Sequence, residues 1–282
     1  MAVSFQNTAA PDDVLLSAHL SVRYGAKPHV LKDVDLTIRR GEVLGLVGQS
    51  GSGKSTIAMS ILGLLNRKHA RVEGAIKFYG NDSREIDLLQ LKERELRSLR
   101  GKTLALVLQS PLSSLNPALK IRTQLNEAWR AHSSSSDRDC GRAIRAALES
   151  VSLPSSDELL GKLPAQMSVG QAQRVLIAMA VMHRPALLMA DEATSALDVI
   201  TQSEILALFR QLNRQTGMAI LYISHDLASV AGICDRIAIL QQGQIVECGS
   251  KEQIFLEPQH EYTQRLIAAM PALPSKTRAA SV

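Results

Sequence analysis

The sequence predicts an α/β fold with three parts: a core sheet, an antiparallel β subdomain beside it, and a helical subdomain at about residues 110–184. Three observations lead to this prediction. Short apolar stretches that fit buried strands alternate with helical stretches, an order typical of α/β sheets. A glycine-rich loop at residues 48–55 separates an apolar strand from a helix. Residues 121–182 have a helical pattern, interrupted by a serine run at 133–136.

The glycine-rich loop fits the phosphate-binding P-loop, and its residues are Gly48, Gln49, Ser50, Gly51, Ser52, Gly53, Lys54 and Ser55. Residues 42–47 fit a buried strand and residues 56–65 a helix, which is the context that the motif requires. Glycines allow successive N–H groups to turn toward phosphates, and the helix N-terminus adds positive charge. Lys54 is expected to reach the β- and γ-phosphates and Ser55 to bind Mg²⁺. The core is therefore predicted to be a P-loop NTPase core, with the loop and Thr56 as nucleotide contacts.

Three stretches near the N-terminus fit the antiparallel β subdomain. Residues 14–24 read as a strand that ends at an aromatic residue, and residues 34–38 alternate apolar and polar side chains. Residues 72–79 fit a third strand of this layer. Residues 86–101, rich in Leu, Arg and Glu, fit a short amphipathic helix.

The remaining core elements are predicted from the same apolar patterns: strands at 103–108, 187–190 and 218–223, a helix at 201–215, and a hairpin formed by 236–240 and 244–248. Residues 110–117 are turn-rich and cannot be regular helix throughout. We therefore expect one large domain over residues 12–270. Residues 1–11 are expected to be a flexible N-terminus, and residues 271–282, which lack a core pattern, a flexible tail.

The composition fits a globular protein with a slight basic excess. Hydrophobic residues make up 45% of the chain, and the formal net charge is +5. A basic balance suits a nucleic-acid partner or an anionic membrane surface, although a solvated surface with some extra Lys and Arg is the simpler explanation. Aromatic residues are only 3% of the chain, which argues against a stacking platform for single-stranded nucleic acid.

The cysteines and the apolar segments bear on the compartment. Cys140, Cys234 and Cys248 are far apart and form no metal-like cluster, which suggests a reducing compartment without a disulfide framework. The first residues lack a basic start and an apolar run, so no secretion signal is expected. No apolar stretch approaches the length of a membrane span. If the protein works at a membrane, we expect it to be a peripheral subunit.

Polar residues follow two of the predicted core strands. Asp191 and Glu192 follow the apolar strand at 187–190, and we expect Asp191 to hold Mg²⁺ directly or through water and Glu192 to act as the general base toward water. His225 follows the strand at 218–223 and can reach a γ-phosphate, because strand ends converge on the ligand. Surface acids and single histidines are common in structural roles, so this interpretation depends on the P-loop.

A second anion site is indicated at residues 167–171, a small-residue turn before a helical run. As a local string, this segment also fits a simple helix cap. Residues 195–198, which end at Asp198, lie just past the acidic pair.

Together these segments resemble the ATP-binding subunit of ABC transporters over roughly residues 12–270. The motifs occur in the family's order: Walker A at 48–55, the Q-loop residue Gln109, the signature at 167–171, Walker B with the catalytic glutamate at 187–192, the D-loop at 195–198 and the switch histidine in 224–226. The resemblance implies ATP and Mg²⁺ as cofactors and ATP hydrolysis as the activity. It also implies that Tyr24 stacks on adenine, that Gln109 contacts the metal, and that Gln109, Glu192 and His225 form the catalytic set.

A finer resemblance is to the ATPase subunits of peptide, opine and nickel importers, carried by residues 110–117, 177–199 and 260–271. It implies coupling of ATP hydrolysis to the import of peptides, nickel or related small solutes. Many members of that group carry a cysteine cluster near the C-terminus. This chain has no cysteine after Cys248, so we predict no iron–sulfur cluster.

The resemblance also implies a head-to-tail dimer, homomeric or heteromeric, with two ATP molecules between the subunits. Ser168, Gly170 and Gln171 would then contact the ATP held by the partner's Walker A. The D-loop residue Asp198 is also expected to contribute to nucleotide binding. Expected partners are membrane permease subunits, a second ATPase subunit and, indirectly, a solute-binding protein, with no nucleic acid. The chain itself is expected to be peripheral, at the cytoplasmic face of the inner membrane. The alternative is a soluble ABC-type ATPase of DNA repair or translation. Those proteins typically carry two ATPase domains or a long coiled-coil insertion, and neither is visible in this sequence.

Two expectations concern conformation. Val169 stands where the family signature usually has glycine, and a β-branched residue disfavours positive φ. If the position requires positive φ, strain, slower hydrolysis of the facing ATP and a preference for a heterodimer are expected. If Val169 already has negative φ and its side chain turns away, it is neutral. Lys54 is expected to face solvent while the nucleotide site is empty.

Overall fold

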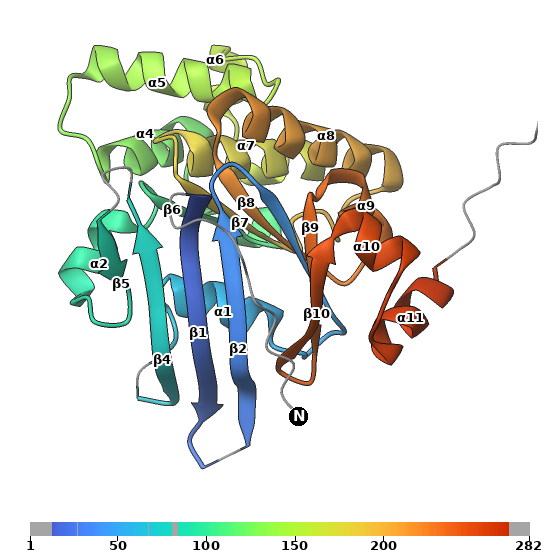
Figure 1. Ribbon diagram of the computed structural model, residues 1–282. Coiled ribbons are helices and arrows are strands. Elements are labelled where there is room, and N and C mark those ends of the chain that lie inside the picture. The colour runs from blue at the N-terminus through green and yellow to red at the C-terminus, as the bar shows by residue number, and fades with distance from the viewer. Residues whose placement is uncertain (1–12, 27, 67, 81–83, 271–282) are drawn as a thin grey trace, which may run out of the picture.

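The computed structural model describes residues 13–26, 28–66, 68–80 and 84–270, and it has two β-sheets with a group of helices at one end (Figure 1). The α/β fold, with a parallel core sheet, an antiparallel sheet and helices, is confirmed. The flexible ends predicted at 1–11 and 271–282 lie outside the described residues.

The larger sheet has six strands in the order β10-β9-β3-β8-β7-β6. Five of them run parallel, and β10 pairs antiparallel with β9. The bounds of the strands are β3 Val43–Val47, β6 Leu104–Val107, β7 Leu187–Asp191, β8 Ala219–Ser224, β9 Arg236–Gln241 and β10 Gln244–Ser250.

Both faces of the parallel sheet are buried. Val43 and Val47 of β3 belong to a core shared with the helical layer, whereas Leu44 and Leu46 belong to a second core shared with the antiparallel sheet. The division follows from the alternation of side chains along a strand. Because neither face meets water, these strands are continuous apolar runs in the sequence, as is typical of parallel sheets.

The smaller, antiparallel sheet has the order β2-β1-β4-β5, with bounds β1 Val14–Tyr24, β2 His29–Arg39, β4 Ala70–Tyr79 and β5 Glu85–Asp87. β2 begins before the predicted start at residue 34, because its first residues continue the hairpin with β1 as far as the pair Arg23–His29. Helix α1, Lys54–Ile61, packs into the core shared by the two sheets.

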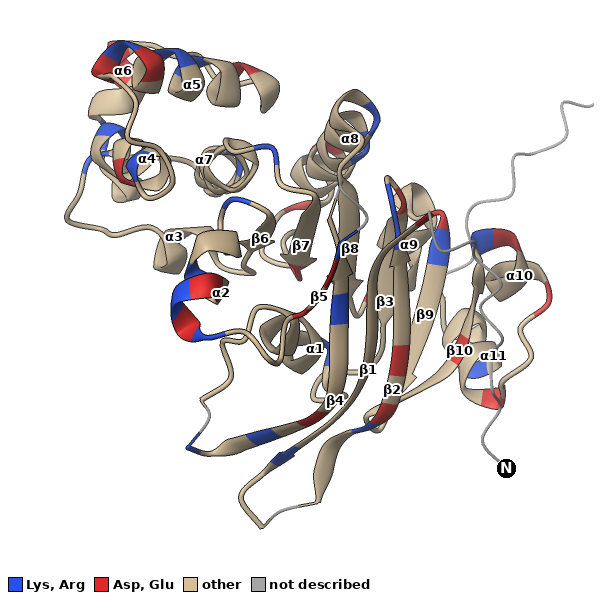
Figure 2. Cartoon of the chain, turned by 60° about the vertical axis from the view of Figure 1, so that its left-hand side comes forward, with Lys and Arg blue, Asp and Glu red and all other residues tan. Residues whose placement is uncertain are grey.

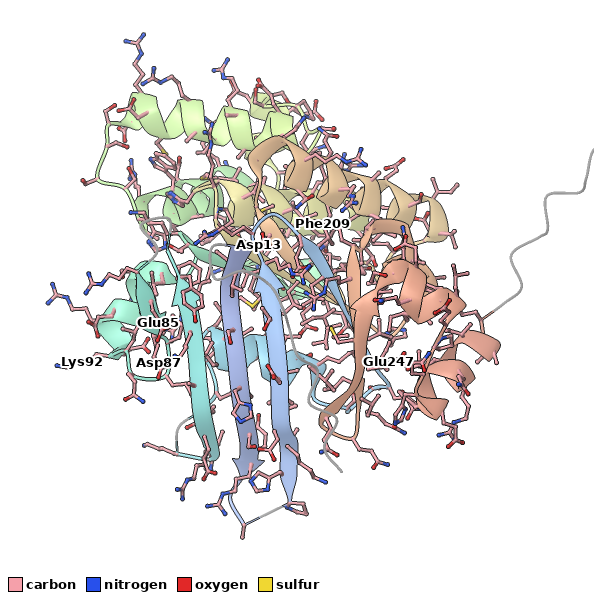
Figure 3. The ribbon with its side chains drawn as sticks, viewed as in Figure 1. Asp13, Glu85, Asp87, Lys92, Phe209 and Glu247 are labelled. Carbon is pink, nitrogen blue, oxygen red and sulfur yellow. The ribbon has the colours of Figure 1, made fainter. Side chains whose placement is uncertain are left out.

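Helix α2 is shorter than predicted and spans Glu93–Leu99. The start of the expected 86–101 helix is instead bound to β4, since the Asp87 carboxylate accepts hydrogen bonds from the N–H groups of Ile76 and Leu89. Figure 3 shows Asp87 beside β4 and near α2. The prediction from amphipathic composition therefore started the helix too early: α2 begins at Glu93 and not at residue 86.

The segment 121–182 contains several helices in place of one run, and the turn-rich segment before it contains a single helical turn, α3. The bounds are α3 Pro111–Ser114, α4 Ile121–Arg130, α5 Asp137–Ser150, α6 Asp157–Gly161 and α7 Val169–Val181, with a short 3-10 turn at Pro164–Gln166. The serine run ends where Ser136 caps α5 by accepting from the Asp139 N–H. The long helix α8, Val199–Thr216, lies beside them at the top of Figure 1.

Three C-terminal helices were not predicted: α9 Leu227–Ile233, α10 Lys251–Leu256 and α11 Glu261–Ala268. The N-termini of two of them could have been recognised from the sequence. Asp226 caps α9, and Ser250 forms a capping box with Gln253 at α10. Glu247 of β10 anchors the α10–α11 link, because its buried carboxylate accepts from the N–H groups of Gln259 and His260 (Figure 3).

Among the described residues, none of the helices is both long and apolar enough to cross a membrane. Positively and negatively charged residues are interspersed on α2, α5 and α6 (Figure 2). These three helices therefore carry charge of both signs.

Candidate functional site

The P-loop connects β3 to α1, and glycine is required at two of its positions. A Cβ at Gly48 would collide with the Leu240 carbonyl oxygen of β9. Gly53 has φ 107°, and a Cβ there would lie 2.5 Å from the Leu31 side chain. The loop is thus pressed between β9 and β2, and its backbone is held in a left-handed conformation that favours glycine.

Lys54, the first residue of α1, is buried, with 5% of its surface exposed. Its Nζ donates to the carbonyl oxygens of Gly48 at 2.8 Å and Gln49 at 3.0 Å. The expectation of a solvent-facing lysine is therefore wrong, because the loop curls around the ammonium group. Burial lowers the pKa of Lys54, and the nearby carboxylates of Glu192 and Asp191 partly oppose this shift.

Four parallel strands bring the predicted catalytic residues to one edge of the sheet. The P-loop follows β3 and His225 follows β8. Asp191 ends β7, Glu192 comes directly after it, and Gln109 follows β6. The spatial order β3-β8-β7-β6 places these segments side by side. The carboxyl ends of parallel strands therefore form one row along the mouth of the P-loop.

Glu192 lies at the centre of this row. Its Oε1 is 3.8 Å from Lys54 Nζ and 3.3 Å from His225 Nδ1. Its backbone has φ 48°, which is unusual for a residue other than glycine, and its N–H donates to the Ile223 carbonyl oxygen at 3.0 Å. This hydrogen bond to β8 holds a conformation that costs about 1–3 kcal/mol in isolation. The bent backbone directs the carboxylate back toward the P-loop.

Asp191 and Ser55 fit a magnesium site. Asp191 is buried, and its Oδ1 has no hydrogen-bond partner among the described residues. Burial raises the pKa of Asp191, and a hydrogen bond with the Ser55 side chain partly opposes the shift. An unpaired buried carboxylate oxygen beside a hydroxyl is a donor set of the kind that Mg²⁺ prefers. Asp191 and Ser55 would therefore hold the metal, and Gln109, which is exposed at the end of β6, could join them from the neighbouring strand.

The raised pKa of Asp191 predicts a pH dependence of Mg²⁺ binding. Because the metal needs the ionised carboxylate and protons compete for it, affinity should fall as the pH drops, starting at a higher pH than for an ordinary aspartate. The measurement is the Mg²⁺ dependence of binding of a fluorescent ATP analogue between pH 5 and 8. Asp191→Asn is the control, because asparagine does not titrate and the pH dependence that remains in this variant comes from the nucleotide itself. Identical pH profiles for the two proteins would contradict the assignment.

Tyr24 ends β1 and is half-buried against the core between the sheets. It lies in the β1–β2 hairpin, and Leu31 of the same hairpin is the residue that approaches Gly53 of the P-loop. The hairpin therefore places an aromatic ring in the neighbourhood of the phosphate-binding loop, which is compatible with the predicted role in stacking on adenine.

The remaining predicted residues form a second group at the N-termini of α7 and α8. Ser168 caps α7 by accepting from the Gln171 N–H, and Asp198 caps α8 by accepting from the N–H groups of Ile200 and Thr201. Within the described part of the chain, no hydrogen bond or ion pair joins Ser168, Gly170 or Gln171 to the P-loop. The predicted nucleotide-contacting residues therefore form two groups that share no hydrogen bond or ion pair in the described part of the chain.

Val169 is the first helical residue of α7 and does not have positive φ. The premise of the strain argument is therefore wrong, and the slower hydrolysis and heterodimer preference that it motivated lose their support. The side chain is 37% exposed. Space is limited at the neighbouring Gly170, where a Cβ would lie 2.9 Å from Cγ2 of Thr201.

Sequence reasoning missed two contributors to the site. The carbonyl oxygen of Leu240 in β9 lies close to Gly48. Because this is a backbone contact, the residue type at position 240 does not indicate it. Thr201 hydrogen-bonds the Asp198 carboxylate through its hydroxyl at 2.7 Å. The spacing of a cap residue and a threonine three positions later could have indicated this contact.

The fold and this row of residues define a P-loop nucleotide-binding protein. Comparison with known families gives a match of residues 31–195 to the ABC transporter family, which covers more than half of the chain. The chain is 39% identical over 265 residues to the glutathione import ATP-binding protein GsiA of Salmonella typhimurium, covering 93% of this chain and 42% of that protein. It is also 39% identical over 248 residues to a putative peptide import ATP-binding protein of Brucella ovis, covering 88% of this chain and 73% of the relative.

Solved structures agree with this result. The dimeric ATP-binding cassette MJ0796 in a post-hydrolysis state with ADP and Pi has a TM-score of 0.70 and 27% identity, covering 84% of this chain and 98% of that chain. The protein cbiO1 of Clostridium perfringens, part of the transporter complex cbiONQ, has a TM-score of 0.70 and 26% identity, covering 92% and 96% of the two chains. The chain therefore belongs to the ABC transporter family. It spans less than half the length of the glutathione import proteins that it matches.

Proposed function

We propose that the chain is the ATP-hydrolysing subunit of an ABC importer for peptides, nickel or related small solutes, and that peptides such as glutathione are the solute class. The observation that carries the proposal is the convergence of Lys54, Glu192 and His225, with distances of 3.8 Å and 3.3 Å around one carboxylate oxygen. The names of the relatives, which are import ATP-binding proteins for glutathione and peptides, support the solute class.

In this proposal the residues divide the work of ATP hydrolysis. The P-loop N–H groups and Lys54 bind the phosphates. Asp191, Ser55 and Gln109 would hold Mg²⁺, which would supply positive charge to offset the charge developing on the phosphates. Glu192 accepts a proton from the attacking water, and His225 orients Glu192 and approaches the γ-phosphate. The contact of His225 Nδ1 with Glu192 Oε1 at 3.3 Å supports this pairing.

The second group of residues supports a head-to-tail dimer. Ser168, Gly170, Gln171 and Asp198 are separate from the P-loop of their own chain, so a second subunit would bring them to its nucleotide. Exposed apolar side chains lie at the same place, since Val199 and Ile200 are 81% and 74% exposed. The other proposed partners are permease subunits and, through them, a solute-binding protein. The proposed location is the cytoplasmic face of the inner membrane.

The proposal is tested by two measurements on the full chain. Purified protein is expected to hydrolyse ATP in the presence of Mg²⁺, and the protein expressed in its own cell is expected to co-purify with membrane permease subunits. A solute-binding protein encoded or isolated with the complex then identifies the solute. Salt-dependent binding to nucleic acid without permease association would instead favour the soluble ABC ATPase of DNA repair or translation.

Stacking on Tyr24 gives a separate prediction for nucleotide affinity. Tyr24→Ala should weaken ATP binding by about 1–3 kcal/mol, the range found for single bases stacked on aromatic side chains. Tyr24→Phe and Tyr24→Trp should be tolerated, because stacking uses only the face of the ring. Binding is measured with a fluorescent ATP analogue. Equal losses in the Phe and Ala variants would point to a hydroxyl hydrogen bond or a packing role.

A further inference from the structure

Gly170 of the signature is closely approached by a side chain of the next helix. A Cβ at this position would lie 2.9 Å from Cγ2 of Thr201 in α8. Gly170 is the second residue of α7, and this close approach gives a packing reason for glycine at the position. Gly141, in the middle of α5, faces open space by the same measure and offers a control.

The Thr201 methyl group cannot easily rotate away from Gly170. The Thr201 hydroxyl donates to Asp198 Oδ2 at 2.7 Å, and the Thr201 N–H donates to Asp198 Oδ1 at 3.0 Å. A change of rotamer would move the hydroxyl and break its bond to the D-loop aspartate. The methyl group and the hydroxyl of one residue thus contact two different motifs.

A second link joins the same two helices further along. Arg174 of α7 donates to Glu204 of α8 at 2.9 Å, and the same guanidinium donates to the Val151 carbonyl oxygen at 2.9 Å. Residues 174 and 204 each lie about one turn beyond the Gly170–Thr201 contact. The N-terminal ends of α7 and α8 are therefore joined by an apolar contact and an ion pair.

We propose that Thr201 is a positioning residue that fixes the D-loop Asp198 to the signature helix, and that residue 170 is glycine because it must admit the Thr201 methyl group. The role in turnover rests on the proposed ATPase function, since the joined signature and D-loop would approach the partner's nucleotide as one unit. The contact itself does not depend on that function.

The test is a double-mutant cycle between Gly170→Ala and Thr201→Ser in the full chain. Gly170→Ala should lower ATP turnover about tenfold, equivalent to about 1.4 kcal/mol. Thr201→Ser removes Cγ2 but keeps the hydroxyl for Asp198, so the double variant should recover most of the lost turnover. Gly141→Ala, which adds a Cβ into open space, should leave turnover unchanged. A double variant as slow as Gly170→Ala would overturn the proposal.

Two further readouts separate positioning from general packing and from failure of the proposed function. Thr201→Val keeps a methyl group against Gly170 but removes the bond to Asp198, so kcat should fall while the affinity of the P-loop for ATP stays the same. Equal losses in both would overturn the positioning role. The melting temperatures of the same cycle should also be non-additive. If the wild-type protein hydrolysed no ATP, the proposed function would fail while the melting temperatures still tested the contact.

Discussion

Replacing Glu192 with glutamine should lower ATP turnover by about 10²–10⁴-fold, the range typical for loss of a general base. Glutamine keeps the length and shape of the side chain and can remain near Lys54 and His225, but it cannot accept a proton from water. ATP binding should persist, so an ATP-stabilised dimer should accumulate. Steady-state hydrolysis, nucleotide binding and size-exclusion chromatography with ATP measure the three effects.

The control for this variant is Glu252→Gln, which changes the same functional group on the exposed side of α10. It should leave turnover unchanged. Because glutamine and glutamate have similar backbone preferences, the positive φ at residue 192 should be equally accessible in the variant, and its thermal stability should stay close to that of the wild type. Turnover of Glu192→Gln near the wild-type value would mean that another group activates the water.

Lys54→Ala should abolish hydrolysis and strongly weaken ATP binding, because the phosphates lose their charged ligand. The burial of Lys54 adds a second effect in the empty protein. Without the ammonium group, the carbonyl oxygens of Gly48 and Gln49 lose their donor, and leaving such groups unpaired costs about 1–3 kcal/mol each. Circular dichroism should therefore show retained secondary structure, while thermal unfolding shifts to a lower temperature.

Lys32→Ala is the matched control, because Lys32 lies on β2 near the P-loop with an exposed side chain. It should affect neither ATP binding nor the melting temperature. Unimpaired MgATP affinity in Lys54→Ala would refute the phosphate role. An unchanged melting temperature together with lost ATP binding would show that water replaces the lysine in the empty loop.

The sequence predicted the parts of the site that depend on residue type along one strand or loop. The glycines of the P-loop, the acidic pair after an apolar strand and the histidine after another strand each carry a local pattern, and parallel strand order places them together. The parallel sheet was predictable for the same reason, since its buried strands are apolar throughout.

The features that were missed depend on backbone groups or on the packing of elements, which residue type along one strand or loop does not reveal. The burial of Lys54 follows from carbonyl groups of its own loop, which any residue supplies, and the left-handed backbone of Glu192 follows from a hydrogen bond to Ile223. The close approach of Gly170 to Thr201 depends on how two helices pack. Likewise, the start of the predicted 86–101 helix is bound to β4, because the Asp87 carboxylate accepts a hydrogen bond from the Ile76 N–H. Amino-acid composition does not reveal such a contact.

The position of β3 in the sheet also has a consequence for synthesis on the ribosome. Its two neighbours are β8 and β9, so Val43 pairs with Ile220 and Leu44 with Arg236. The strand that precedes the P-loop therefore has no partner until β8 and β9 have been made, whereas β1, β2 and β4 can pair early. Such distant pairing is slow and leaves an apolar strand edge exposed to aggregation. Nascent chains stopped before β8 should accordingly need a chaperone, and they should gain the ability to bind nucleotide only after β9 has left the ribosomal tunnel.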